Sequence, residues 1–297
     1  MKINVIAGLF SLAVSTIVGV APVRAEPATV TDAEVARVQI QHIRNATAKV
    51  TYGDTTFLVD PMLAGKGAYP GFEGTYRSEL RNPLIDLPMP ASEVMAHVDA
   101  VIVTHTHLDH WDDVAQAKLP KAIPLFVQNA ADAALVRSQG FKDVRVLGEN
   151  SEFNGITLSK TGGQHGTDAM YAVAPLAKVL GEAMGFVLRA KNYKTVYFVG
   201  DTIWRDEVQD AFSRYRPDVV VLNTGDARVN GFEDSIIMGK QDTLRALEHA
   251  PQATVVAVHM DTVNHAALSR KELRKFVAEK SLQKRVLVPA DGRVMKF

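Results

Sequence analysis

Four metal-ligand side chains lie within six residues of this chain, in the pattern His105-x-His107-x-Asp109-His110. Three imidazoles and a carboxylate so close together repel or lack partners once buried, unless a divalent ion binds them. The preceding residues, 99–104, contain a β-branched apolar run typical of a buried strand. The cluster is therefore expected where a central strand ends, in a crevice of an α/β fold.

The spacing within this cluster suggests two ions. Side chains two apart in an extended segment face the same way, so His105 and His107 are aimed at one ion. After the chain turns, Asp109 and His110 are placed to reach a second. The alternative interpretation is a chance group of polar loop residues, and it predicts no matching ligands elsewhere in the chain.

Three further ligand candidates occur downstream. His165 lies in a Gly-Gly-Gln-His-Gly loop, where glycines let the backbone approach a bound ion. Asp201 and His259 each follow an apolar run of the buried-strand type. Alone, each would more simply be a capping Asp or a core His; beside the first cluster, all three become candidate ligands.

With these residues, the chain resembles the metallo-β-lactamase superfamily of metal-dependent hydrolases, whose signature is His-x-His-x-Asp-His followed by a distant His, Asp and His. The resemblance covers residues 37–297. It implies the following ligand set: His105, His107 and His165 for one metal, Asp109, His110 and His259 for the other, and Asp201 as the bridge.

The run Val-Gly-Asp-Thr at 199–202, the strand ending Leu-Val-Asp-Pro at 58–61 and the stretch 258–265 are similar to one branch of that superfamily. This branch contains ascorbate-6-phosphate lactonase and N-acyl-phosphatidylethanolamine phospholipase D. It implies attack of a metal-generated hydroxide on a lactone or ester, with a phosphodiesterase as the alternative. A metal-binding module without turnover is the alternative of another class. The bridging Asp201 argues against a β-lactamase, because those relatives typically use cysteine or serine near that position and this chain has no cysteine.

The expected cofactors are two divalent metal ions. Nitrogen-rich sites favour Zn²⁺, and the carboxylates leave Mn²⁺ or Fe²⁺ as alternatives. Asp109 is the candidate catalytic residue, carrying the proton to the leaving group. Asp112 has two open roles: it supports a ligand imidazole, or it caps the helix expected to begin there.

Two irregular segments are expected to shape the substrate pocket. Residues 62–90 are rich in Gly, Pro and aromatics and show no regular period, so they predict a long loop, either functional or packed on itself. Residues 167–183 form a second insertion. The candidate substrate-binding residues are Tyr76, Arg77, Asp226 and His265. Arg77 and Arg81 are the arginines available for a phosphate, or they are simply solvated.

The first 25 residues predict export. Lys2 precedes an apolar run, and Val23-Arg24-Ala25 offers small residues at the positions that a signal peptidase reads. An uncleaved membrane anchor is the alternative, but the run is short and Pro22 follows it. The chain therefore divides into a signal peptide (1–25), a linker (26–36) and a hydrolase domain (37–297). We expect a periplasmic or secreted bacterial protein with no stable membrane insertion after cleavage.

Early hairpins followed by strands that alternate with helices predict an α/β (α+β) chain with two sheets face to face and helices outside. The resemblance makes this a four-layered αββα sandwich. Helices are expected near 130–138, 207–213, 240–249 and 269–280, and one alternating strand over 152–159. The 33 basic and 33 acidic residues are scattered, so a small-molecule substrate is the expected partner and nucleic acid is not. The sequence predicts no oligomeric state.

Overall fold

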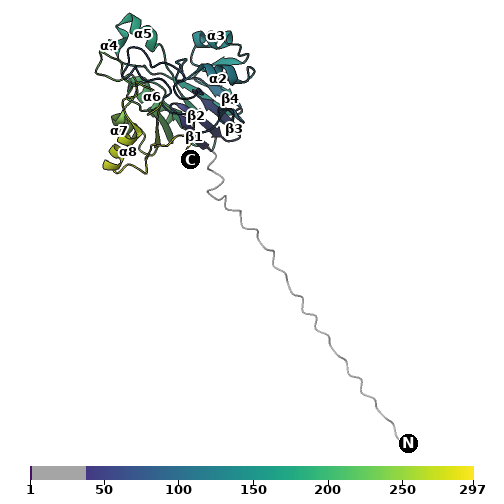
Figure 1. Ribbon diagram of the computed structural model, residues 1–297. Helices are drawn as coiled ribbons and strands as arrows, with labels where there is room; N and C mark the ends of the chain where they lie inside the picture. Colours follow the sequence, from purple (N-terminus) through teal and green to yellow (C-terminus); the bar gives the residue numbers. More distant parts are fainter. Residues whose placement is uncertain (2–37) are drawn as a thin grey trace.

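A computed structural model of the protein describes Met1 and residues 38–297, which form two mixed sheets between layers of helices (Figure 1). The predicted linker 26–36 and, apart from Met1, the predicted signal peptide 1–25 lie outside the described residues. Within the described part of the chain, none of the helices has the length and apolar character needed to cross a membrane.

The first sheet has seven strands in the order β14-β1-β2-β3-β4-β5-β6. It begins with an antiparallel meander and continues with parallel strands, because the later connections include helices. Its strands are β1 (Val38–Arg44), β2 (Thr47–Tyr52), β3 (Thr55–Val59), β4 (Ala100–Ile102), β5 (Leu125–Val127), β6 (Val144–Val146) and β14 (Val294–Lys296).

The second sheet repeats this plan in the order β13-β12-β11-β10-β9-β8-β7. The strands from β7 to β10 pair antiparallel, and the pairs from β10 to β13 are parallel. Its strands are β7 (Ser151–Phe153), β8 (Ile156–Thr161), β9 (Gly185–Arg189), β10 (Val196–Phe198), β11 (Val219–Asn223), β12 (Thr254–Val258) and β13 (Val286–Leu287).

Helices cover the outer face of each sheet. α1 (Ala91–Met95), α2 (Asp113–Lys118) and α3 (Ala130–Ser138) belong to the first half, and α6 (Asp206–Tyr215), α7 (Lys240–His249) and α8 (Arg270–Glu279) to the second (Figure 1). Two short helices, α4 (Asp168–Tyr171) and α5 (Ala174–Leu180), stand apart from these layers. The predicted αββα sandwich is confirmed.

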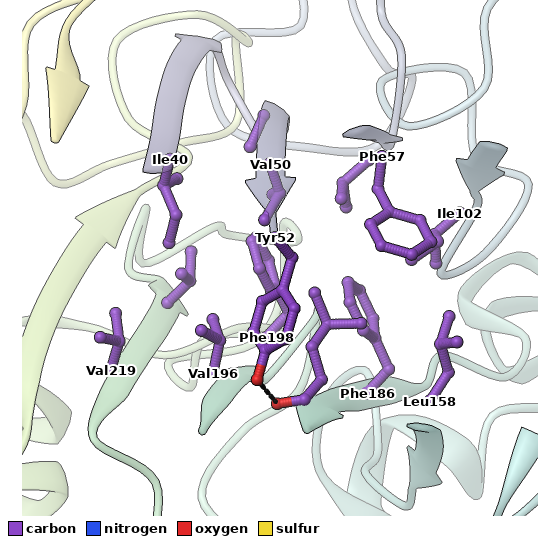
Figure 2. Packing of buried hydrophobic residues seen from close by; sticks show 14 of the residues in the cluster. Ile40, Val50, Tyr52, Phe57, Ile102, Leu158, Phe186, Val196, Phe198 and Val219 are labelled. Carbon is purple, nitrogen blue, oxygen red and sulfur yellow. Dashed lines mark hydrogen bonds between the residues drawn. The ribbon is translucent and has the colours of Figure 1, made fainter. Parts of the chain in front are cut away.

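The largest apolar cluster fills the space between the sheets. Ile40, Phe57 and Ile102 face Phe186 and Phe198 across it, and all of them are buried (Figure 2). The rings of the last two stack with centroids 4.8 Å apart. Each fully buried side chain of this kind contributes roughly 1.5–3 kcal/mol, so this layer clamps the two sheets together and fixes the edge where their strands end.

The structure departs from the sequence-based expectations at three places. The strand expected over 152–159 is a hairpin of β7 and β8, because Asn154 and Gly155 both take positive φ angles and form its turn. The insertion 167–183 contains α4 and α5. The edge strand β14 was not predicted; its short run gains order by pairing with β1. Residues 62–90 contain no helix or strand, as expected for a long loop.

Candidate metal centre

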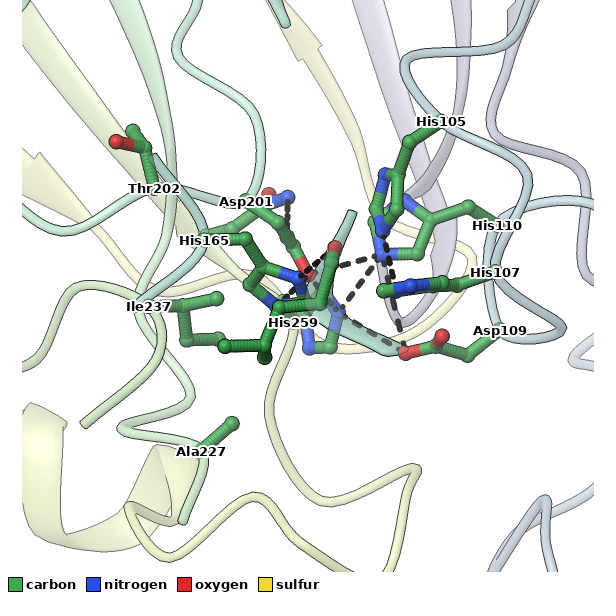
Figure 3. Close-up of polar contacts among 12 residues, drawn as sticks. His105, His107, Asp109, His110, His165, Asp201, Thr202, Ala227, Ile237 and His259 are labelled. Carbon is green, nitrogen blue, oxygen red and sulfur yellow. Dashed lines mark hydrogen bonds and ion pairs between the residues drawn. The ribbon is translucent and has the colours of Figure 1, made fainter. Parts of the chain in front are cut away.

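The predicted ligands converge at one edge of the sandwich, where strands of both sheets end (Figure 3). The His-x-His-x-Asp-His cluster follows β4, Asp201 follows β10 and His259 follows β12. His165 lies in the loop after β8. His259 is held in the left-handed region at φ 65°. Strain of this kind in a non-glycine residue is typical of functional sites.

The predicted ligands form three trios of residues. In each trio, one potential ligand atom per residue lies within 4.8 Å of the other two. Two of them match the trios expected for the two metals, and the third joins ligands of both. The trios are His105, His107 and His165; Asp109, His110 and His259; and His105, His110 and Asp201.

Asp201 lies between the two expected metal positions. Its Oδ2 atom is 3.2 Å from Nε2 of His110 and 3.5 Å from Nε2 of both His165 and His259. One carboxylate oxygen thus faces imidazoles of both trios, the position that a bridging ligand requires. Asn223 donates to the other oxygen, Oδ1, at 2.6 Å and so fixes the direction of the carboxylate.

The arrangement of nitrogens fits bound cations. Nε2 of His105 lies 2.9 Å from Nδ1 of His107, and Nε2 of His110 lies 3.1 Å from Nε2 of His259. Nε2 of His165 is buried and has no hydrogen-bond partner among the described residues. Lone pairs that converge in this way are satisfied by divalent ions, and a set of five imidazoles and two carboxylates suits zinc or a similar first-row metal.

The pKa values of His165 and His259 shift in opposite directions. Burial lowers the pKa of His165 to about 3. Burial acts in the same direction on His259, but the carboxylates of Asp201 and Asp109 outweigh it and raise the pKa of His259 to about 9. Although burial favours the neutral acids, the surrounding histidines hold the pKa of both carboxyls well below the ordinary value. The carboxylates are therefore ionised, and a metal ion would replace protons held by their histidine partners.

Polar groups outside the ligand set orient the imidazoles. Nδ1 of His110 lies 2.9 Å from Oδ2 of Asp60, whose oxygens also accept from the backbone and hydroxyl of Thr104. His107 faces the carbonyl of Val179 through Nε2 at 2.8 Å. Such contacts set the ring tautomer and ligand basicity.

Sequence reasoning did not identify Asp60 and Asn223 as supports of the ligands. A signal was present, because Asp60 directly follows β3 and Asn223 is the last residue of β11, at the same edge of the sandwich. Asp112 takes the second of its two open roles. Its Oδ1 accepts from the Ala115 amide at the start of α2, and its Oδ2 accepts from the amides of Leu63 and Ala64.

A cavity of about 440 Å³ opens directly on the ligands. His107, Asp109 and His165 form its floor, and His265 lies in its wall. The other lining residues are mainly apolar and, apart from Leu108 within the ligand cluster, come from both irregular segments and from 229–236: Phe72, Glu73, Gly74, Thr75, Leu176, Val179, Leu180, Val229 and Ile236.

Of the four candidate substrate residues, the structure places only His265 in this cavity. Burial lowers the pKa of His265 to about 4, so its imidazole is neutral at pH 7. Asp226 lines a different cavity and is paired with Arg228 at 2.7 Å. Tyr76 is 44% exposed, and the guanidinium of Arg77 lies over its ring.

Sequence and structure comparisons agree with this geometry. Residues 55–260 match the family described as Beta-lactamase superfamily domain. The UPF0173 protein YddR of Bacillus subtilis (strain 168) is 45% identical over 88% of this chain and 100% of its own length. The UPF0173 metal-dependent hydrolase PYRAB05000 of Pyrococcus abyssi is 26% identical over 77% of this chain and 88% of its own.

Two solved structures are similar over nearly the whole described part. A possible metal-dependent hydrolase from Veillonella parvula DSM 2008 has a TM-score of 0.87 and 53% identity, covering 88% of this chain and 100% of that chain. The isothiocyanate hydrolase from Delia radicum gut bacteria has a TM-score of 0.84 and 48% identity, covering 87% of this chain and 99% of that chain. Fold and site define a metal-dependent hydrolase. The chain belongs to the metallo-β-lactamase superfamily and, within it, to the UPF0173 family.

Proposed function

We propose that this enzyme is an exported hydrolase that binds two divalent ions, zinc first, and acts on a small uncharged electrophile, with an isothiocyanate as the first candidate. The observation that carries the substrate class is the composition of the cavity above the ligands. Among the described residues that line it, none is a lysine or arginine, and most of those outside the predicted ligand set are apolar. Such a cavity suits an uncharged molecule with an apolar substituent.

A phosphodiester is a poor match for this cavity. Arg77 donates to the carbonyls of Asn264 and Ala266, and Arg81 donates to those of Gly67 and Ala68. Neither guanidinium lines the cavity, whereas the carboxylates of Glu73 and Asp109 do. A substrate anion would therefore be balanced by the bound metal ions alone, without a cationic side chain in the described lining.

An isothiocyanate matches the cavity in its lack of charge and its apolar substituent, and the 48% identity to an isothiocyanate hydrolase supports it. In its hydrolysis the oxygen of water bonds to the central carbon, the C–N bond breaks, and nitrogen takes both water protons. The products are a primary amine and carbonyl sulfide. The apolar part of the substrate would lie against Leu176, Val179 and Ile236, which removes apolar surface from water.

Two divalent ions held by this ligand set would supply Lewis acidity and would lower the pKa of a bound water toward neutral pH. Two ions are proposed because Asp201 faces imidazoles of both trios. Asp109 is ionised and lines the cavity, so it is placed to take a proton from water and pass it to the leaving nitrogen. Export is proposed from the sequence of residues 1–25.

A lactone or carboxylic ester is the second candidate. The same lack of lysine and arginine in the cavity wall suits these uncharged carbonyl compounds, and Asp109 would serve their leaving oxygen in the same way. The two candidates differ in the leaving atom, which is nitrogen in one and oxygen in the other, so product analysis separates them.

The test is turnover of a substrate panel by the zinc-loaded protein, with His107→Ala as the blank. The panel contains allyl and phenethyl isothiocyanates, a γ-lactone, an aliphatic ester and a phosphodiester, and chromatography quantifies amine, acid and phosphate products. Amine formation from isothiocyanates is expected, and acid formation alone would favour the second candidate. Turnover confined to the phosphodiester would overturn the substrate class, and no turnover with metals bound would indicate a binding module.

A further inference from the structure

His265 is a buried histidine beside the metal ligands that belongs to none of the three ligand trios. Its ring lines the cavity and is 6% exposed. Nδ1 is buried and has no hydrogen-bond partner among the described residues. A buried polar group without a partner costs about 1–3 kcal/mol, so its retention in a substrate cavity points to a ligand that satisfies it.

Hydrogen bonds to three consecutive backbone carbonyls, those of residues 264–266, hold the backbone around His265. Arg77 donates through Nε to the carbonyl of Asn264 at 3.0 Å and through Nη2 to that of Ala266 at 2.7 Å. The amide of Arg228 donates to the carbonyl of His265 itself at 3.0 Å. One guanidinium thus spans the residue from both sides, which restricts the position of its imidazole.

The imidazole is held as well. Phe72 meets it edge to face, with ring centroids 5.0 Å apart. The same loop is tied to the neighbouring residue, because the side chain of Asn264 accepts from the Phe72 amide at 3.0 Å and donates to Thr75 at 2.9 Å. Asn82 completes this anchor with two 2.8 Å bonds to Asn264. The ring and its packing partner therefore share one rigid support.

We propose that His265 is a catalytic residue that donates a hydrogen bond to the leaving nitrogen of the substrate, and that Arg77 is its positioning residue. A neutral imidazole carries one N–H, which suits this role without a change of charge. Negative charge grows on the leaving nitrogen as the C–N bond breaks and its electron pair moves there. A preorganised donor at such an atom is worth about 10²–10³ in rate. The inference rests on the proposed function, because it requires a substrate with a leaving heteroatom.

The test compares His265→Phe with His265→Gln. Phenylalanine keeps the ring contact with Phe72 but has no donor, whereas glutamine keeps an N–H. We expect His265→Phe to lower kcat about 100-fold with metal content and thermal unfolding unchanged. The kcat of His265→Gln should be about tenfold higher than that of His265→Phe. His249→Phe is the matched control, because His249 is an exposed histidine whose ring packs at a tilt against that of Trp204.

A series of aryl isothiocyanates with increasingly electron-withdrawing substituents distinguishes donation from packing. These substituents stabilise the leaving nitrogen, so the loss caused by His265→Phe should shrink along the series. A loss that is the same for every substrate would mean that His265 acts only through packing and would overturn the proposal. So would wild-type kcat in His265→Phe, or loss of its metal. A wild type that hydrolyses no substrate would instead overturn the proposed function.

The role of Arg77 is tested by a double-mutant cycle. Arg77→Ala should lower kcat about tenfold in the wild type and hardly at all in the His265→Phe background, because it acts through that imidazole. Additive losses would show that Arg77 supports the structure generally and does not position His265.

Discussion

The floor and the wall of the active-site cavity are built in different ways. The floor consists of the seven predicted ligands, which lie directly after β12 or in the loops that follow β4, β8 and β10, and Asp60 and Asn223 support it from beneath. The wall comes mainly from 62–90 and 167–183, which contain no strand and only two short helices. Strands clamped by a shared core hold a metal floor in one geometry, whereas irregular segments can change sequence without moving it. We therefore infer that the metal chemistry depends on the floor, whereas the fit of the substrate and the proposed donor His265 belong to the wall.

The largest effect is expected from the floor. His107→Ala should remove metal from the site and lower turnover at least 1000-fold, because it takes away one of the three histidines proposed to hold its ion beside the bridging Asp201. Metal analysis and product formation are measured together. His249→Ala, at an exposed histidine on α7, should leave both unchanged. A His107→Ala protein that keeps its metals and its activity would contradict the ligand assignment.

A smaller effect is expected one layer beneath the floor. Asp60→Ala removes the carboxylate 2.9 Å from Nδ1 of His110, and loss of such a support typically costs about 10–100-fold in metal affinity. Competition with a chelator measures the change. Asp112→Ala is the matched control, because this carboxylate is equally buried but bonds only to backbone amides. Equal losses of metal affinity in the two variants would show that the contact between Asp60 and His110 does not specifically support the metal centre.

Asp112→Ala should instead reduce folding stability. It removes the cap of α2 and leaves the amides of Leu63 and Ala64 without acceptors. The expected cost is about 3 kcal/mol of unfolding free energy, measured by urea denaturation of the metal-loaded protein. Stability within about 0.5 kcal/mol of the wild type would show that this carboxylate does not anchor the start of the long loop.

The smallest effect is expected from the wall. Leu176→Lys places a charge in the apolar lining and should raise KM several-fold for isothiocyanates with large apolar substituents. Metal content and kcat should stay unchanged. Val173→Lys, at an exposed position just before α5, is the control. Loss of metal in Leu176→Lys would mean that wall and floor are not independent.

The same division explains what could be predicted from sequence. The convergence of the floor residues could be predicted because apolar runs mark buried strands and metal-binding side chains come soon after them, as at Asp201 and His259. Asp60 also ends a strand, but its bond to His110 depends on the pairing of β3 with β4, which no local pattern encodes. In the wall, Arg77 had two open interpretations, and its bonds to the carbonyls around His265 join segments almost 190 residues apart. Asp226 follows a strand as Asp201 does, yet turns to another cavity and pairs with Arg228.

The metal-to-protein ratio of Asp201→Ala tests the central claim most directly. Asp201 is proposed to bridge two ions because its Oδ2 faces imidazoles of both trios. We predict two ions per chain in the wild type and in the control Asp226→Ala, and at most one in Asp201→Ala, with turnover falling in parallel. A wild type that binds a single ion at saturation, or an Asp201→Ala protein that keeps two ions and full activity, would contradict the account.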